Sequence, residues 1–134
     1  MGIGEKQKFK EVIIDGMKVD YDNVLEKNFD LAKKFIRITG SGTIDIINKE
    51  NLSTNDKILI YLVGKKYAKE AQLADYEGAG NKELKDELGI PEGTLLPGIK
   101  HLRDKRMIKT IKKDGLSFHN ILPNLIEKVL KKLG

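Results

Sequence analysis

The stretch from Asn81 to Ile108 constrains the fold of this chain more than any other, because it holds two short helical patterns joined by a tight turn. In the first pattern, Leu84 and Leu88 share one face, and charged residues lie away from it. Asn81 is a residue type that caps the start of a helix, and Gly89 suits the left-handed turn that ends one. The sequence therefore predicts a helix from Asn81 to Leu88 and a sharp turn after it.

A second helix is predicted to run from this turn to about Met107. Its apolar residues at helical spacing are Leu95, Ile99 and Leu102. Proline inside a helix costs about 3 kcal/mol, so Pro97 fits only if the helix starts near Gly93 or Thr94. With Thr94 as the cap, Pro97 falls in the first turn, where its missing amide hydrogen is not needed. Two helices that meet in this way make a helix-turn-helix, whose second helix is shaped to enter a DNA major groove.

Two residues of the second helix leave alternatives open. Gly98 either lets the backbone approach a partner closely or fits a tight crossing with another helix. Leu96 faces outward if Leu95, Ile99 and Leu102 face inward. It then either contacts a thymine methyl group or belongs to a protein interface.

Basic residues concentrate in the same part of the chain. Residues 81–134 hold 12 basic and 7 acidic side chains, whereas residues 1–80 hold 13 of each, so the C-terminal part carries the whole formal charge of +5. Between Pro97 and Lys113, seven basic side chains accompany Asp104 alone. Such a block is the pattern expected of phosphate binding, and a solvated lysine-rich surface is the alternative.

Residues 1–50 are predicted to form a small α/β extension with two β-hairpins, in which residues 1–10 are frayed. The first hairpin covers Glu11–Asp20 and turns at Asp15-Gly16, a pair that suits a type I′ turn. The second pairs Phe35–Thr39 with Thr43–Ile47 across a glycine-rich turn. An extension of this size is small for a core of its own, so it packs on the rest of the chain or on a second subunit.

A helix capped by Asp22 or Asn23 is predicted between the two hairpins. Its inner face would hold Val24, Leu25, Asn28, Ala32 and Phe35. A longer helix then starts after Ser53, where Asp56 completes a capping box, and runs to about Ala74. Its first half is apolar nearly all round, which is typical of a buried central helix. Gly64 lowers helix stability, so we expect another helix to cross close to it.

The C-terminal part continues with a hairpin and a helix. Ile108–Ile111 and Leu116–Ile121 read as strands that meet at Asp114-Gly115, and a hairpin directly after a helix-turn-helix is a wing. The helix after Pro123 carries an apolar stripe made of Leu125, Ile126, Val129, Leu130 and Leu133. This stripe predicts a homodimer interface, and the alternative is that it covers the chain's own core.

The order of helix, helix, second helix and wing from Ser53 to Ile121 resembles the winged helix-turn-helix domains of small archaeal transcription regulators. The phrase LGIPEGTLLPGIKHLRDKRMI, from Leu88 to Ile108, is similar to their core pattern. The resemblance covers about half of the chain and implies a winged helix-turn-helix fold there. With the α/β extension of residues 1–50, the predicted fold class is α+β, and the winged helix-turn-helix domain with its C-terminal helix takes up residues 51–134. The resemblance also implies binding of duplex DNA through a recognition helix at about 94–107 and a basic wing at about 108–121.

Candidate contacts follow from residue type. Residues expected to reach bases or the groove are Thr94, Lys100, His101 and Arg103. Residues expected to bind phosphates are Lys105, Arg106, Lys109, Lys112 and Lys113. Arg103 is the best candidate for reading a guanine, because its fork matches two acceptors of that base. His119 on the return strand either reaches the DNA backbone or packs half-buried.

The leading hypothesis is a transcription regulator that binds double-stranded DNA. The second expected partner is another copy of the chain, in a homodimer. The rival is a winged-helix protein-interaction module within a larger assembly, and an enzyme is the third class. Paired carboxylates, a nucleophile elbow and a metal-ligand set are missing from the sequence, which has no cysteine and two histidines. We therefore expect no catalysis, no cofactor, no metal, no evident small-molecule ligand and no membrane association, in a cytoplasmic protein.

Overall fold

The structure is a computed structural model that describes residues 3–17 and 21–134, and it is an α+β fold. The helices are α1 (Ile3–Met17), α2 (Tyr21–Lys27), α3 (Phe29–Ala32), α4 (Thr54–Glu70), α5 (Asn81–Leu88), α6 (Glu92–Asp104) and α7 (Ile126–Leu133). The strands are β1 (Ile36–Ile38), β2 (Ile44–Ile46), β3 (Ile108–Lys113) and β4 (Leu116–Ile121), and single 3-10 turns cover Lys49–Asn51 and Pro123–Leu125. β1 pairs with β2 and β3 with β4, both antiparallel.

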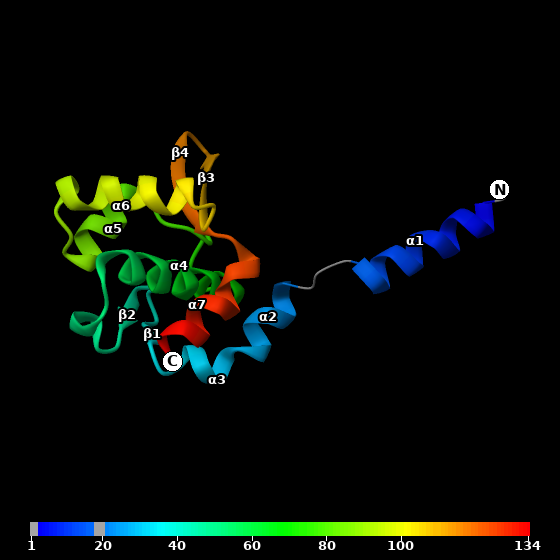
Figure 1. The fold of residues 1–134 in the computed structure, drawn as a ribbon, viewed down its shortest axis with the longest axis horizontal. Coiled ribbons are helices and arrows are strands. Elements are labelled where there is room, and N and C mark those ends of the chain that lie inside the picture. The colour runs from blue at the N-terminus through cyan, green and yellow to red at the C-terminus, as the bar shows by residue number, and fades with distance from the viewer. Residues whose placement is uncertain (1–2, 18–20) are drawn as a thin grey trace.

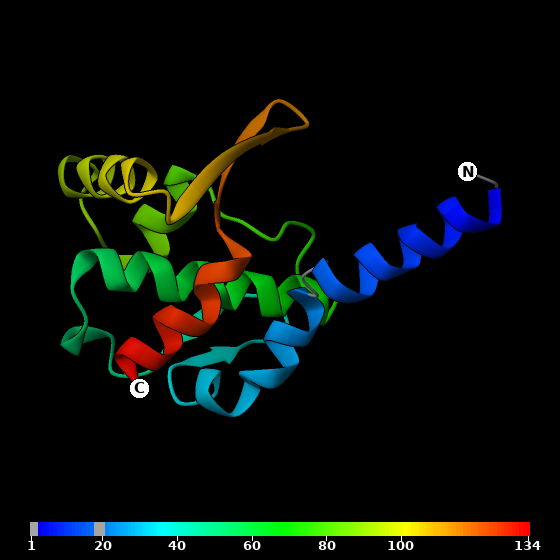
Figure 2. The same cartoon turned by 45° about the vertical axis from the view of Figure 1, so that its right-hand side comes forward.

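Helix α4 is the centre of the fold. Ser53 caps it as predicted, since its Oγ accepts a hydrogen bond from the Asp56 amide at 3.1 Å. From Ile58 to Lys65 every residue of α4 is buried, which confirms a central helix without a polar face there. Figures 1 and 2 show α5, α6 and the β3–β4 hairpin on one side of α4, and α2, α3, β1, β2 and α7 on the other.

Gly64 marks the closest packing against α4, but the neighbouring element is not the predicted helix. The β1–β2 hairpin lies there instead, and a Cβ atom at Gly64 would come within 2.5 Å of Ile44 Cγ2 and 3.3 Å of Ile36 Cγ2. Glycine therefore allows the hairpin to lie directly on the helix. The sequence marked the close approach correctly and the partner wrongly.

The segment before β1 is helical, in two pieces. α2 begins at Tyr21, so neither Asp22 nor Asn23 precedes it as a cap. Of the predicted inner face, Leu25, Asn28 and Ala32 are buried, while Val24 and Phe35 are partly buried. The Tyr67 hydroxyl of α4 donates to the carbonyl of Leu25 at 2.6 Å, and burial raises the pKa of Tyr67 to about 12.

The first predicted hairpin is wrong. Residues 11–17 belong to α1, which also includes residues 3–10 that we expected to be frayed, and residues 18–20 lie outside the described residues. Asp15-Gly16 therefore lies within a helix rather than at a turn. The α1 side chains that the structure describes are exposed, Phe9, Val12 and Ile13 among them, so they have no surface on which two strands could pack.

Two helix starts differ from the prediction. Gly80 precedes α5, so Asn81 is its first residue, and the Asn81 side chain bonds elsewhere. Helix α6 begins at Glu92 rather than at Thr94, because the Thr94 and Leu95 amides both donate to the Pro91 carbonyl at 2.9 Å. Pro97 thus lies inside α6, beyond the first turn, and the helix lacks one hydrogen bond there. Burial of the three apolar residues of α6 offsets this cost.

Gly98 fits a tight helix crossing. A Cβ atom there would lie 2.9 Å from Asn55 Oδ1 and 3.5 Å from Ile58 Cδ1 of α4. Of the two alternatives for this residue, the structure supports the crossing. The turn before α6 is as predicted, with Gly89 in the left-handed conformation at φ 64°.

The C-terminal hairpin is confirmed with its turn. Strands β3 and β4 pair from Ile108 with Ile121 to Lys113 with Leu116, and both turn residues have positive φ, 54° at Asp114 and 77° at Gly115. Ile108 and Ile121 are buried at the base of the hairpin, and the tip is exposed. Figure 2 shows the hairpin rising beyond α6.

The apolar stripe of the last helix packs inside the chain. Ile126, Val129 and Leu130 are part of the buried core, and Leu125 and Leu133 are packed against it. The structure therefore supports the alternative, that the stripe covers the chain's own core, and these five residues are not free to form a dimer interface. The predicted homodimer has no support from this helix.

One buried cluster unites the part of the chain that the structure describes after residue 20. It contains Leu25, Ala32, Ile36 and Ile44 together with apolar residues of α4 to α7. The segment before residue 50 thus packs on the rest of the chain, which is one of the two arrangements expected for it. Among the described residues there is no helix with the length and hydropathy needed to cross a membrane.

Candidate nucleic-acid interface

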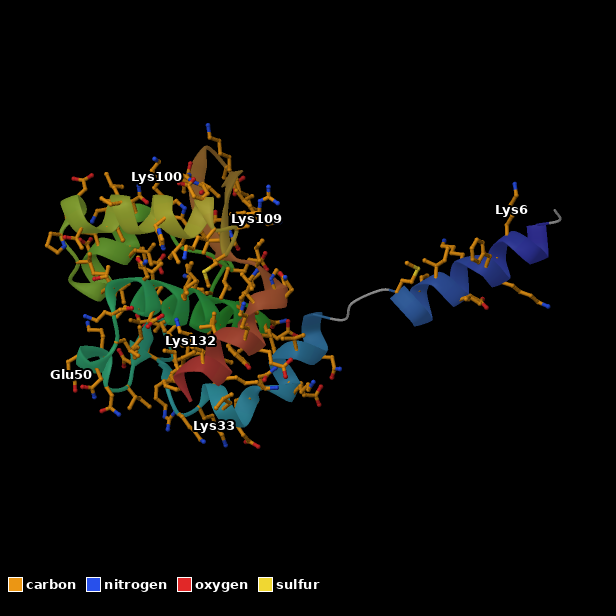
Figure 3. The ribbon with its side chains drawn as sticks, viewed as in Figure 1. Lys6, Lys33, Glu50, Lys100, Lys109 and Lys132 are labelled. Carbon is orange, nitrogen blue, oxygen red and sulfur yellow. The ribbon has the colours of Figure 1, made fainter. Side chains whose placement is uncertain are left out.

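The basic residues gather on α6 and the β3–β4 hairpin. We call the exposed side chains Lys100, Arg103, Lys105, Arg106, Lys109, Lys112 and Lys113 the basic face. In Figure 3, Lys100 on α6 and Lys109 on β3 lie on the same side of the molecule, and Lys33 and Lys132 lie on the other side of α4. All nine predicted contact residues are exposed, the other two being Thr94 and His101. The fold therefore brings the predicted residues onto one helix, the hairpin beside it and the turn that joins them.

The end of α6 has an unusual residue in its cap. The Arg106 amide donates to the Arg103 carbonyl at 3.0 Å, and the Met107 amide donates to the Leu102 carbonyl at 2.9 Å, a Schellman pattern. Arg106 has φ 58°, a left-handed conformation that usually belongs to glycine and costs other residues roughly 1–2 kcal/mol. The strained position holds an exposed cation of the basic face, in the turn between α6 and β3.

A chain of polar side chains joins α6, the β3–β4 hairpin and α5. Arg103 Nη1 donates to Thr110 Oγ1 at 3.3 Å, Thr110 Oγ1 lies 2.9 Å from His119 Nδ1, and His119 Nε2 lies 2.6 Å from Asn81 Oδ1. The Asn81 oxygen can only accept, so His119 Nε2 carries the proton and Nδ1 accepts from the Thr110 hydroxyl. A neutral imidazole therefore makes both of the hydrogen bonds of His119. The chain of bonds fixes how Arg103 lies against β3.

His119 is buried, with 5% of its surface exposed. Burial lowers its pKa, and the nearby Arg103 guanidinium lowers it further. Of the two alternatives for this residue, the structure supports packing rather than contact with a DNA backbone. Its main chain also pairs with Ala79, through bonds of 3.0 and 2.8 Å, so the loop before α5 extends the β3–β4 sheet.

A second polar cluster fixes α5 on α4. The Tyr61 hydroxyl donates to Glu83 Oε2 at 2.5 Å, and Lys65 Nζ lies 3.2 Å from the same oxygen. Burial, with the bond to Glu83, raises the pKa of Tyr61. Lys65 and Glu83 neutralise each other, and the cluster holds α5 against α4.

The exposed apolar side chains near the basic face do not form one patch. Leu96 on α6 is 42% exposed and Leu116 near the hairpin turn is 56% exposed. The outward direction predicted for Leu96 is thus confirmed. The two residues lie on different elements, and the exposed residues around Leu96 on α6 include Pro97 and Lys100.

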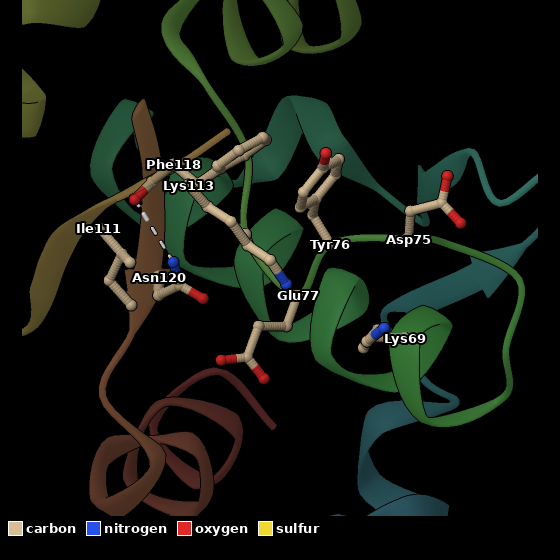
Figure 4. Close-up of a pocket in the computed structure, with 9 residues that line it drawn as sticks. Lys69, Asp75, Tyr76, Glu77, Ile111, Lys113, Phe118 and Asn120 are labelled. Carbon is tan, nitrogen blue, oxygen red and sulfur yellow. Dashed lines mark hydrogen bonds between the residues drawn. The ribbon is translucent and has the colours of Figure 1, made fainter. Parts of the chain in front are cut away.

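Sequence reasoning missed two features of this region. One is the role of Asn81, which we assigned to a cap and which instead holds His119, a residue 38 positions away. The other is a cavity of about 350 Å³ behind the hairpin, lined by the loop of residues 75–78 and by β3 and β4 (Figure 4). Neither has a local sequence signal, because each depends on side chains that only the tertiary fold brings together.

Comparison with known proteins gives no family. No protein-family model matches the chain, and no curated protein or solved structure matches it. Within the described residues, no group of three or more acidic or histidine side chains is arranged to hold a metal ion. The assignment of a function therefore depends on the geometry alone.

Proposed function

We propose that this chain binds double-stranded DNA as a winged helix-turn-helix transcription regulator. The observation that carries the proposal is the basic face, in which seven exposed cations lie on α6, the adjoining hairpin and the turn between them. Helix α6, with 13 residues, is about 20 Å long, and a B-DNA major groove of about 12 Å width admits a helix.

In this proposal the two elements have different tasks. Helix α6 lies in the major groove, where Thr94, Lys100, His101 and Arg103 contact base edges. Arg103 has further N–H groups beyond the one bonded to Thr110, so it can still donate to guanine acceptors. The lysines and arginine of 105–113 bind phosphates, which sets position and carries no sequence information. A homodimer would add specificity by placing two α6 helices one helical turn apart.

A titration with random duplex DNA at about 50 mM and about 200 mM salt tests the proposal. If the five cations from Lys105 to Lys113 each neutralise a phosphate, the slope of log K against log salt is about −4.5. Affinity then falls roughly 500-fold across this fourfold change in salt. Absence of measurable binding at about 50 mM salt would contradict the proposal.

Replacing Arg103 by alanine tests the division of tasks. We expect a loss of about 1–3 kcal/mol in binding to the preferred sequence and a weaker preference at one base position. Lys112→Ala should weaken binding to all sequences alike. If the two variants behave identically across sequences, the assignment of reading and anchoring residues is wrong.

The second candidate is a protein-interaction module, which the exposure of Leu96 favours. An interface centred there would place an apolar anchor at the middle of α6. Leu96→Glu separates the candidates. This variant should abolish binding to a protein partner. Affinity for DNA should fall only by the loss of one apolar contact and the repulsion of one added negative charge.

A further inference from the structure

The hydrogen bonds that lead from Asn81 to Arg103 all run in one direction. The Asn81 oxygen accepts from His119 Nε2, and His119 Nδ1 accepts from the Thr110 hydroxyl. The hydroxyl hydrogen of Thr110 is thereby used, and the lone pairs on its oxygen accept from Arg103 Nη1. Thr110 is therefore the last link before Arg103, and its hydroxyl can take only one role in this chain of bonds.

The part of this chain of bonds that lies on the hairpin is rigid. Thr110 and His119 are directly opposite each other on β3 and β4, and the His119 main chain also pairs with Ala79. His119 is buried, and Thr110 is half-buried with a β-branched side chain, which has few rotamers. The Thr110 oxygen is therefore held at a fixed place beside α6.

Arg103 is exposed in the last turn of α6, and within the described residues it forms no ion pair with an acid. Its bond to Thr110, at 3.3 Å, uses one hydrogen of Nη1. The guanidinium has further N–H groups, so Nη2 and Nε keep a pair of donors free. Ordering an exposed arginine on binding lowers affinity, because the side chain loses rotamers. The bond to Thr110 restricts these rotamers before any partner binds.

We propose that Thr110 is a positioning residue that determines base specificity, because it holds Arg103 in the orientation that reads a guanine. The inference rests on the proposed function, in which Arg103 donates to the two major-groove acceptors of that base. Thr110 itself does not touch the base. Its hydroxyl lowers the cost of ordering Arg103 at guanine alone, since the other bases do not offer a matching pair of acceptors. Loss of the hydroxyl therefore weakens the preference for guanine and leaves the phosphate contacts unchanged.

Titrations with duplexes that differ at one base pair test this role in the full chain. The starting duplex is selected from random DNA by the wild-type protein, and the changed base pair is the one whose preference Arg103→Ala abolishes. Thr110→Val keeps the shape of the side chain and should reduce the preference for guanine by about 2- to 12-fold, the cost of ordering one long side chain. Thr110→Ser keeps the hydroxyl and should retain the wild-type preference. Affinity for random duplex DNA should be the same in both variants. Thr43→Val, at a half-buried threonine beside β2, is the control and should change neither quantity.

A measurement without DNA separates this inference from the proposed function. NMR relaxation of the Arg103 Nε–H group reports the order of the side chain, which should be high in the wild type and in Thr110→Ser and lower in Thr110→Val. Equal order in the wild type and in Thr110→Val overturns the inference, and so does a guanine preference that survives Thr110→Val but not Arg103→Ala. Both of these results leave the proposed function standing. A wild-type protein without any base preference contradicts the base-reading role of Arg103 in the proposed function and, with it, this inference.

Discussion

The two β-hairpins that the structure describes are both antiparallel pairs of strands, but they pack differently. The β1–β2 hairpin lies flat on α4, with Ile36 and Ile44 buried against Gly64. The β3–β4 hairpin is buried only towards its base, by Ile108 and the residues from His119 to Ile121, and its lysine-bearing strands project from the core. A hairpin pressed on a helix contributes to stability, whereas a projecting one is available for contacts with a partner.

The largest expected effect is on the first hairpin. Ile44→Ala removes a fully packed side chain beside a glycine that cannot fill the space, so we expect a loss of about 2–5 kcal/mol in the free energy of unfolding. Ile111→Ala in the second hairpin, where the side chain is half-buried, should cost less than about 1.5 kcal/mol. Urea denaturation of both variants measures the difference. Equal losses would mean that the projecting hairpin is as important to the core as the packed one.

The next prediction concerns Arg106 at the end of α6, where one substitution should change the free energy of unfolding and DNA affinity in opposite directions. Arg106→Gly relieves a left-handed arginine and should stabilise the protein by about 1 kcal/mol, and under the proposed function it should also weaken DNA binding by the loss of one phosphate contact. The matched control is Gln72→Gly after α4, where Gln72 has φ 61° in the same Schellman pattern, away from the basic face. It should give a similar gain in stability and leave DNA binding unchanged. A loss of DNA affinity in both variants would show that Arg106 has no special role.

The smallest expected effect is on the pH dependence of the free energy of unfolding. It should come from the second hairpin, where His119 of β4 bonds Thr110 of β3 and Asn81 of α5. The pKa of His119 is lowered in the folded state, so the unfolded state binds a proton first as pH falls. Stability is therefore full above the ordinary histidine pKa of about 6.5 and decreases as pH falls from there towards the lower folded pKa. His119→Gln should remove this decrease between about pH 7.5 and about pH 5.5, and His101→Gln, at an exposed position, should keep it. An unchanged pH dependence in His119→Gln would contradict the role of a neutral buried imidazole.

Local signals predicted the elements that local interactions determine. Ser53, Gly89 and Asp114-Gly115 each require a particular backbone conformation, so the start of α4, the end of α5 and the second hairpin turn were predicted correctly. Asp15-Gly16 has the same turn chemistry, yet it lies in α1, where the exposed side chains give no pairing surface for a hairpin. Turn residues therefore predict a hairpin only where its strands have something to pack on.

The candidate site was also predictable only where it depends on local sequence. The residues of the basic face follow from charge and helical spacing, which are properties of one segment. The bonds of His119 to Thr110 and Asn81 and the cavity beside Asn120 depend on the pairing of β4 with the loop before α5. The apolar stripe of α7 also needed the tertiary fold, because its spacing is the same whether it covers a core or a second chain.

The most direct test of the account compares two sets of three lysines on opposite sides of α4. One variant replaces Lys105, Lys109 and Lys112 of the basic face by glutamine. The control replaces Lys33, Lys34 and Lys128, which are also exposed and change the net charge by the same amount. For random duplex DNA, the slope of log K against log salt should become less steep by about 2.7 in the first variant and stay unchanged in the control. Equal changes in both variants would contradict the claim that α6 and the second hairpin form the surface that binds DNA.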